Sequence, residues 1–488
     1  MKQSSVGASR SRFSLTQPYR AVARRSRLIQ ASAARSQSNQ QLLYVLMVAS
    51  MTMIFNGSVF GVALPTIRDT YGINSETAAW LVTSYSLTFM MFMPLYGRLG
   101  DSLGKRNLIV AGLGLFSAGT LLCLAAPTLG WLLIGRTIQG AGVAGVAPLS
   151  MAIISERFPG KERGRALGTW NSIGPMVGIF APLIAGFMVE HLGWRTIFVP
   201  VFLIGVVAMS VVWLLIPSLR KVRLDFLRHF DWLGVLYLAA AVTFLVFFIS
   251  SRPITGVEPL HDWRLLGLSL GAGVLFVLRE RRHADPFLSL DLFRVPSLRW
   301  ASIGSGLRMF TMSGIGFLMP LYLADVHGLS AGMIGAFIMT NAAALLVTMR
   351  AGGQMADRWG SRLPVMIGLS VQSACMLYFA LLPADVPMTF VVGGLLCHGL
   401  GAGLSLAAFH RASMSQIRQE QSGQAAGIYS MIRFAGILMG SALGGVLLQQ
   451  AEIVTGSMTQ AYQFVFIFIA AAAFCGVLAG SRLREVEA

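Results

Sequence analysis

Residues 97–106 read GRLGDSLGKR, and residues 353–362 read GQMADRWGSR. In both stretches a Gly is followed after four residues by Asp, after seven by a second Gly and after nine by Arg. Glycine permits tight turns that other residues adopt only with strain. Two such charged turns, 256 residues apart, indicate that the chain contains two related halves.

The composition indicates the surroundings of these halves. The 488 residues are 55% hydrophobic and 12% charged, with a mean hydropathy of +0.68. A soluble domain averages about 25% charged residues. A chain this apolar is typical of an integral membrane protein.

Apolar runs of about 20 residues recur along the chain, each long enough to cross a hydrocarbon layer of about 30 Å as a helix. A membrane β-barrel would instead show alternating segments of about ten residues, so we expect an all-α integral membrane protein. The run at 264–279 is the shortest. We expect fourteen membrane-spanning helices, at 42–66, 78–98, 107–126, 130–154, 166–189, 196–216, 231–251, 264–279, 299–323, 330–352, 363–383, 386–410, 424–448 and 460–481.

The net charge of +18 could fit a nucleic-acid-binding protein, but Lys and Arg gather on alternate connections between the apolar runs. Short loops rich in Lys and Arg stay on the cytoplasmic side of a membrane. Both termini then lie in the cytoplasm, which requires an even number of spans, and nucleic acid is not an expected partner. The basic connections include Lys105, Arg106, Lys161, Arg163, Arg165, Arg220, Lys221, Arg223, Arg279, Arg281, Arg282, Arg358, Arg362, Arg418, Arg482 and Arg484.

The first forty residues hold basic side chains and no acid. We expect a disordered basic tail over 1–40 near anionic lipid, with an organelle transit peptide as the alternative. The four cysteines all lie in apolar runs, and the sequence has no zinc-ligand spacing and no phosphate loop. We therefore expect no metal, no cofactor and no enzymatic activity.

Each copy of the repeated turn follows the second apolar run of its half, on the side predicted to be cytoplasmic. Its Asp can accept hydrogen bonds at a helix start, and its Arg residues can pair with acids. We expect the two turns to form a latch that joins the halves on this face in one state and releases them in the other; a loop that only sets topology is the alternative. The latch comprises Gly97, Arg98, Asp101, Gly104 and Arg106, echoed by Gly353, Asp357, Arg358, Gly360 and Arg362.

The first copy resembles the loop signature between helices 2 and 3 of the major facilitator superfamily, and further motifs follow in the order of that family. From residue 41 onward the chain is identified as a member of its fourteen-span drug:proton antiporter branch. The motifs that carry the resemblance are LIGRTIQGAG (133–142), GPMVG (174–178), APLIAG (181–186), GWRTIF (193–198), DWLGVL (231–236), FVLRERRHADPFLSLDLFR (276–294) and AAGIYSMIRFAGILMGSALG (425–444).

The resemblance implies two pseudo-symmetric six-helix bundles with two extra central helices. It also implies alternating access in a plasma membrane, the inner membrane of a bacterium. We place the N-terminal bundle at 41–217, the linking helices with their cytoplasmic linkers at 218–298, the C-terminal bundle at 299–482 and a short tail at 483–488.

The same resemblance implies that Arg136 is the buried arginine tied to proton coupling, followed by Gln139 and Gly140. An Arg in mid-membrane costs at least about 2.5–3.5 kcal/mol to insert and tends to face an interior or a cavity. In the helix 5 signature, Pro175 lacks an N–H and is expected to kink the helix. The flanking Gly174 and Gly178 allow close helix packing.

Three further polar side chains lie inside predicted spans: Arg308, His398 and Arg433. If Arg136 and Arg308 line a cavity, they make it positive, which favours anionic or zwitterionic cargo; a packing role for Arg308 is the alternative. His398 fits a structural role as well as a functional one.

The first span departs from its relatives. When the shared VALP (62–65) is aligned, Asn56 stands where drug:proton antiporters of this branch typically carry Asp. A buried carboxylate can bind and release a proton near neutral pH because desolvation raises its pKa, whereas Asn cannot. We find no Asp or Glu deep within a predicted span, so coupling would use His398, the gradient of the cargo or the membrane potential. We expect a poor or atypical proton antiporter; a helix-bridging Asn56 with a displaced proton site is the alternative.

The expected function is secondary-active export of amphipathic organic compounds, of the multidrug efflux type. A transporter of anionic or lipid-like molecules is the alternative, and a membrane receptor or scaffold is the alternative outside transport. The expected partners are a small organic molecule and the lipid bilayer, with protons and accessory export proteins left open.

Overall fold

The computed structural model describes residues 17–158, 160–216, 230–283, 288–418 and 421–484, and within them the regular structure is helical, without strands. Thirteen of the described helices are long and apolar enough to cross a membrane. The predicted all-α membrane fold is confirmed. Helix α12 (Trp263–Arg282) is not one of the thirteen, because Arg264 stands at its start and Arg279, Glu280, Arg281 and Arg282 at its end, but its 20 residues have the length that the predicted fourteenth span requires.

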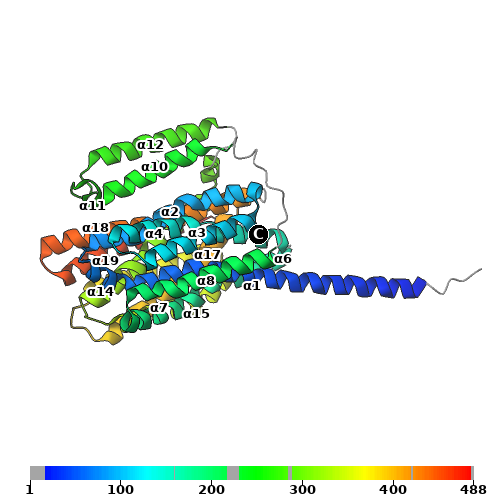
Figure 1. Ribbon diagram of the computed structural model, residues 1–488, viewed down its shortest axis with the longest axis horizontal. Helices are drawn as coiled ribbons and strands as arrows, with labels where there is room; N and C mark the ends of the chain where they lie inside the picture. Colours follow the sequence, from blue (N-terminus) through cyan, green and yellow to red (C-terminus); the bar gives the residue numbers. More distant parts are fainter. Residues whose placement is uncertain (1–16, 159, 217–229, 284–287, 419–420, 485–488) are drawn as a thin grey trace, which may run out of the picture.

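The N-terminal half is built from helices that run back and forth along one axis (Figure 1). Asn74 begins the second helix by accepting a hydrogen bond from Thr77 N through its side chain, which satisfies one of the free N–H groups of the first turn. The helices are α1 (Gln17–Tyr71), α2 (Ser75–Leu103), α3 (Lys105–Leu124), α4 (Leu129–Val143), α5 (Val146–Arg157), α6 (Gly160–Asn171), α7 (Ile173–Leu192), η1 (Trp194–Ile197) and α8 (Phe198–Leu215).

A helical hairpin links the two halves and lies along one side of the bundle, against α2 and α18 (Figure 1). It consists of α10 (Trp232–Ile249), the short α11 (Arg252–Thr255) and α12. Asp231 caps α10 by accepting from Gly234 N at 3.1 Å, and Arg279 Nε of α12 donates to the same carboxylate at 3.0 Å. This carboxylate therefore holds the two hairpin helices together at one end.

The C-terminal half repeats the arrangement of the first. Its third and fourth spans pack closely, as do its second and fourth, because glycines of α17 meet backbone of α15 and α16. The elements are η2 (Leu290–Arg294), α13 (Pro296–Ser313), the π-helical η3 (Gly314–Leu318), α14 (Met319–Asp325), α15 (Ala331–Trp359), α16 (Arg362–Leu381), α17 (Met388–Met414), α18 (Ser422–Thr455) and α19 (Met458–Ser481).

The two halves meet along two helix pairs, α7 with α15 and α2 with α18. Both pairs rely on glycine for close approach: a Cβ added at Gly335 of α15 would meet the carbonyl oxygen of Pro182, and one added at Gly445 of α18 would meet the side chain of Ala79. These positions lie near the ends of the helices that are remote from the repeated turns. We call the end that contains Tyr71 and Asp325 the sealed end, and the end that contains Gly104 and Gly360 the turn end.

The N-terminal segment differs from the expected disordered tail over 1–40, because α1 begins at Gln17 and runs without a break into the first span. In Figure 1 this part of α1 projects well beyond the other helices. Pro18 can stand at a helix start, and the Ala, Arg and Gln residues that follow have high helix propensity. Residues 1–16 lie outside the described part.

Candidate functional site

Both repeated stretches form the turn between two spans, from α2 into α3 and from α15 into α16. Gly104 has φ of 88° and Gly360 has φ of 77°. Only glycine adopts this left-handed backbone without strain, which explains why the repeat carries a Gly at this position. A Cβ added at Gly353 would lie 3.7 Å from the Cβ of Ala407, whereas one added at Gly97 would meet nothing within 4 Å.

The ion pairs at the repeated turns join helices of the same half. In the first copy Lys105 Nζ pairs with Glu156 Oε1 at 2.5 Å, and Arg106 Nη2 donates to the carbonyl oxygen of Trp213 at 2.6 Å. In the second copy Arg411 of α17 pairs with Asp357 at 3.3 Å. Among the other latch residues, Arg358 and Arg362 are exposed, and the side chain of Asp101 lies outside the described part. A latch between the halves stays a prediction.

Arg136 of α4 lies at the centre of a buried polar cluster in the N-terminal half and is only 2% exposed. Its Nε donates to the Leu81 carbonyl at 3.0 Å, and its Nη1 donates to Gln139 Oε1 at 3.0 Å and to Asn56 Oδ1 at 3.4 Å. The guanidinium also lies over the rings of Phe60 and Tyr85, at 3.9 and 4.5 Å. The structure thus brings Asn56, Arg136 and Gln139 together.

This arrangement is possible because a glycine lets two helices approach. A Cβ added at Gly140 would meet the Tyr85 carbonyl and Thr88 Oγ1 on α2. Gln139 is oriented by Thr120, whose Oγ1 accepts from Nε2 at 2.9 Å. The acceptors that face Arg136 are therefore neutral amide and carbonyl oxygens.

The helix 5 signature lies at a helix break. Helix α6 ends at Asn171 and α7 begins at Ile173, but Ser172 between them has helical backbone angles, and Arg165–Leu192 forms one candidate membrane span. The interruption lies three residues before Pro175, which lacks the N–H that would bond to the Asn171 carbonyl, so a kink caused by Pro175 stays a prediction. A Cβ added at Gly178 would lie 3.2 Å from the Cβ of Ala342 on α15, across the contact between the halves, and one added at Gly174 would lie 3.9 Å from Ile54 Cδ1.

Arg308 and Arg433 lie in the interior of the C-terminal half. Arg308 of α13 is 2% exposed, and its Nε donates to Ser405 Oγ at 3.0 Å and its Nη2 to the Ala402 carbonyl at 2.9 Å. Arg433 of α18 is partly exposed and places Nη1 2.9 Å from Nε2 of His410 on α17. The sequence did not single out His410, because it stands near the end of its predicted span.

His398 of α17 is fully buried between two amide side chains. Its Nδ1 accepts from Asn341 Nδ2 at 2.9 Å, and its Nε2 lies 3.2 Å from Gln372 Nε2. A half-turn of the Gln372 amide would let Nε2–H of a neutral ring donate to Oε1, which is otherwise buried without a partner. Both ring nitrogens are then satisfied by neutral groups.

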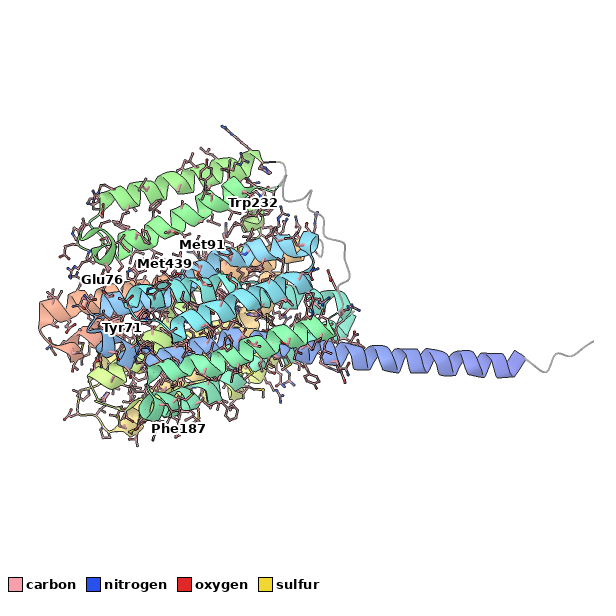
Figure 2. The ribbon with its side chains drawn as sticks, viewed as in Figure 1. Tyr71, Glu76, Met91, Phe187, Trp232 and Met439 are labelled. Carbon is pink, nitrogen blue, oxygen red and sulfur yellow. The ribbon has the colours of Figure 1, made fainter. Side chains whose placement is uncertain are left out.

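Glu76 is a buried carboxyl that the sequence reading missed. It is 0% exposed, accepts from Ser250 Oγ at 2.9 Å through Oε1, and has no hydrogen-bond partner at Oε2. Trp80 Nε1 donates to the same Ser250 at 2.8 Å, so α2 and the linking hairpin share this network. Glu76 is labelled in Figure 2. An acid in the first turn of a helix usually stabilises its exposed N-terminus, which is why its sequence position did not suggest burial.

The sealed end contains an ion pair between the halves that the sequence reading also missed. Arg68, at the end of α1, donates from Nη1 and Nη2 to the two oxygens of Asp325, at 2.7 and 2.5 Å. Tyr462 OH donates to Asp325 Oδ2 at 2.6 Å. The side chains of Arg68 and Asp325 are 12% and 9% exposed, so water competes little for their hydrogen bonds. Nearby, Glu190 of α7 accepts from Gly332 N of α15 at 2.8 Å.

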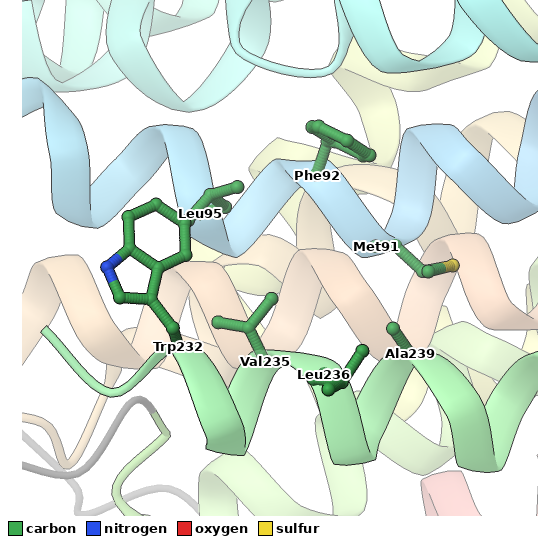
Figure 3. A pocket seen from close by; sticks show the side chains of 7 residues that line it. All are labelled: Met91, Phe92, Leu95, Trp232, Val235, Leu236 and Ala239. Carbon is green, nitrogen blue, oxygen red and sulfur yellow. The ribbon is translucent and has the colours of Figure 1, made fainter.

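An apolar pocket of about 280 Å³ lies between α2 and the linking helix α10 (Figure 3). The indole N–H of Trp232 is the one polar side-chain group among the lining residues, which are Met91, Phe92, Leu95, Trp232, Val235, Leu236 and Ala239. The pocket therefore suits an apolar occupant and is separate from the buried arginines. Within the described residues, no three His, Cys, Asp or Glu side chains gather in a way that could hold a metal ion.

The comparisons with known proteins agree with this architecture. The Major Facilitator Superfamily profile matches residues 46–441. Multidrug resistance protein Stp of Mycobacterium tuberculosis (strain CDC 1551 / Oshkosh) is 30% identical over 415 residues, which cover 84% of this chain and 76% of Stp. Riboflavin transporter RibZ of Clostridioides difficile (strain 630) is 27% identical over 403 residues, which cover 82% of this chain and 86% of RibZ.

Among solved structures, a bacterial homologue of the human lysosomal transporter Spinster, in an inward-facing and unoccupied conformation, superimposes with a TM-score of 0.64 at 15% identity. The match covers 93% of this chain and 99% of that chain. At this identity the likeness concerns the fold alone.

Proposed function

Because the chain belongs to the major facilitator superfamily, we propose that this membrane transporter is a secondary-active exporter of amphipathic organic compounds that works by alternating access. It is not an enzyme. The names of two relatives, a multidrug resistance protein and a riboflavin transporter, support a small organic cargo. Both halves contain buried polar groups beside aromatic rings, and this combination supports an amphipathic cargo.

The observation that carries alternating access is the ion pair of Arg68 with Asp325. It joins the last turn of α1 to the last turn of α14, which belong to different halves, and it must break before the sealed end can open. Tyr462 reinforces it from α19. A polar contact of this kind can be made in one state and lost in another, which is what a transporter with two accessible faces requires.

The alternation of basic loops supports a bacterial inner-membrane location with the turn end and both termini in the cytoplasm. On that orientation the sealed end is periplasmic, and the structure represents a state closed toward the periplasm. Export would begin from this state, with cargo entering from the cytoplasm or the inner leaflet.

Atypical proton coupling is supported by the surroundings of Asn56 and His398. Asn56 presents Oδ1 to Arg136 as a neutral acceptor, and His398 lies between two neutral amides. A second proton on His398 would place an N–H against the NH₂ group of Asn341, so this ring fits a structural role. Glu76 is one buried carboxyl that could bind a proton, at the contact of α2 with the linking hairpin.

The test is transport by the purified full-length protein in sealed vesicles, with and without an imposed pH gradient, across cationic, neutral and anionic organic compounds. We expect some of these compounds to be transported and others not. Cross-linking the two halves to each other should abolish this transport. Ligand-dependent protection against unfolding without any transport would instead support the receptor alternative and overturn the proposal.

A second candidate function, transport of anionic or lipid-like molecules, is favoured by one observation. The buried Arg136 and Arg308 and the partly exposed Arg433 have no carboxylate among their contacts, so the interior carries positive charge that an anionic cargo could balance.

A further inference from the structure

The structure gathers three basic side chains, Arg308, His410 and Arg433, between α13, α17 and α18. Arg308 is anchored to Ser405, and Arg433 contacts His410, which stands five residues further along α17, or about 7.5 Å of helix rise. The three helices meet at Tyr429 of α18, whose OH lies 3.0 Å from Ser305 Oγ of α13 and whose ring centroid lies 5.4 Å from that of His410 on α17. We call these three residues the basic cluster.

Among the described residues of α13, α17 and α18, no carboxylate lies beside these side chains, and Asp357 of the adjacent α15 pairs with Arg411. Helices α13 and α17 contain neither Asp nor Glu. The acid of α18 is Glu452, which stands 19 residues beyond Arg433 and therefore about 28 Å further along the helix. Unpaired cations inside a protein are expensive unless something neutralises them, so the basic cluster is short of an anion.

The hydrogen bonds of the basic cluster are also incomplete. A guanidinium has five N–H groups, but the contacts found for Arg433 use Nη1, and its Nε is buried without a partner. Arg308 Nη1 has only the thioether of Met309, a weak acceptor, at 3.4 Å. In contrast, Arg136 is held by three strong acceptors between two aromatic rings.

The cluster is accessible and has apolar walls. Arg433 and His410 are partly exposed, whereas Arg308 lies behind them. The ring of Phe434 lies 4.9 Å from the Arg433 guanidinium carbon, and the ring of Tyr429 lies 5.4 Å from that of His410. A ligand that reached the two arginines would rest its apolar part against these rings.

We propose that the basic cluster binds the anionic group of an organic cargo, a carboxylate, sulfonate or phosphate carried on an apolar, aromatic-sized body. This inference rests on the proposed transport function. It adds the charge class of the cargo and the site at which the cargo binds. An anionic lipid headgroup supplies the same chemistry, so the source has to be distinguished by experiment.

The test uses the purified full-length protein in nanodiscs of zwitterionic phosphatidylcholine, and it compares two probes with the same ring system, 2-naphthalenesulfonate and neutral 2-naphthol. Charge-assisted hydrogen bonds to two arginines should make the wild type bind the sulfonate at least about tenfold more tightly than the naphthol. Arg433→Gln and Arg308→Gln should each remove most of this preference while naphthol binding is retained, which also shows that the variant is folded. Arg433→Lys should keep part of it.

The matched control is Arg299→Gln, which removes an exposed arginine of the same helix α13 and should leave the preference unchanged. Equal binding of both probes by the wild type, or equal weakening of both by Arg433→Gln, would overturn the proposal. If phosphatidylglycerol in the nanodiscs abolishes sulfonate binding to the wild type, the site belongs to lipid and the cargo assignment is wrong. Because binding is measured without turnover, charge-selective binding without transport would refute the proposed function and leave this site standing.

Discussion

Three arginines lie inside the bundle, and their surroundings separate them. Arg136 has strong acceptors and two aromatic faces, which together balance much of its burial. Arg308 and Arg433 have fewer strong acceptors, and like Arg136 they have no carboxylate among their contacts. A residue that is expensive to bury and incompletely satisfied is better explained by a ligand than by packing.

At Asn56 the structure allows a direct test of proton coupling. Asn56→Asp would place a carboxylate oxygen where Oδ1 now lies, 3.4 Å from Arg136 Nη1. We expect substrate-induced proton release from detergent-solubilised protein to be absent or weak in the wild type and to rise toward one proton per substrate in the variant, because an Asp carboxylate at this position, unlike the Asn amide, can exchange a proton with the cargo.

The control for this measurement is His398→Gln, which should release no fewer protons than the wild type, since both nitrogens of His398 face neutral amides. Stoichiometric release by the wild type that survives His398→Gln would contradict the assignment of Asn56 as the reason for atypical coupling. It would also favour Glu76 as the group that releases the proton.

At the scale of elements, spans and turns could be predicted from the sequence, whereas several contacts could not. The length of each apolar run and the glycine of each repeated turn follow from local physical rules, and Gly104 and Gly360 indeed have positive φ. Pairing across the molecule depends on which helix faces which. Arg68 with Asp325, Arg433 with His410 and Glu76 with Ser250 each join residues far apart in the chain. The continuous helix through 17–40 differs from the expected disordered tail. The expectation relied on the basic, acid-free composition and did not weigh the high helix propensity of the Ala, Arg and Gln residues in this segment.

Glycine at the contact of α7 with α15 gives an element-scale prediction. Gly335→Ala would push a methyl group against the Pro182 carbonyl, so the two helices must separate or strain. We expect a loss of about 1–3 kcal/mol in stability of the sealed state, measured as a lower unfolding temperature in detergent. The matched control is Gly393→Ala on α17, where a Cβ meets nothing within 4 Å. Equal unfolding temperatures for both variants would show that this contact does not limit stability.

At the scale of the whole molecule, we expect the sealed end to open when the turn end closes, and the reverse. The Arg68–Asp325 pair and the α7–α15 contact hold the halves together at one end, while the described pairs at the repeated turns, Lys105–Glu156 and Arg411–Asp357, remain within single halves. If the halves rock as rigid bodies, tightening one end loosens the other. Substitutions at the two ends should therefore shift the same equilibrium in opposite directions.

Asp325→Asn tests this at the sealed end. The variant loses the carboxylate that accepts from Arg68 and Tyr462, a nearly buried interaction whose removal costs about 3 kcal/mol and so shifts a two-state equilibrium about a hundredfold. Spin labels at Leu192 and Val454, which are exposed at this end in different halves, would report the change in a background without the native cysteines. We expect a longer and broader distance distribution than in the wild type, because the sealed end opens. Asp385→Asn removes an exposed acid from the same end and should leave the distances unchanged. Unchanged distances in Asp325→Asn, at equal protein level, would show that this ion pair does not hold the halves together.

Asp101→Asn tests the turn end with the same spin labels. We predict that it cuts transport and shortens the mean label distance, since a weakened latch favours the state closed at the sealed end.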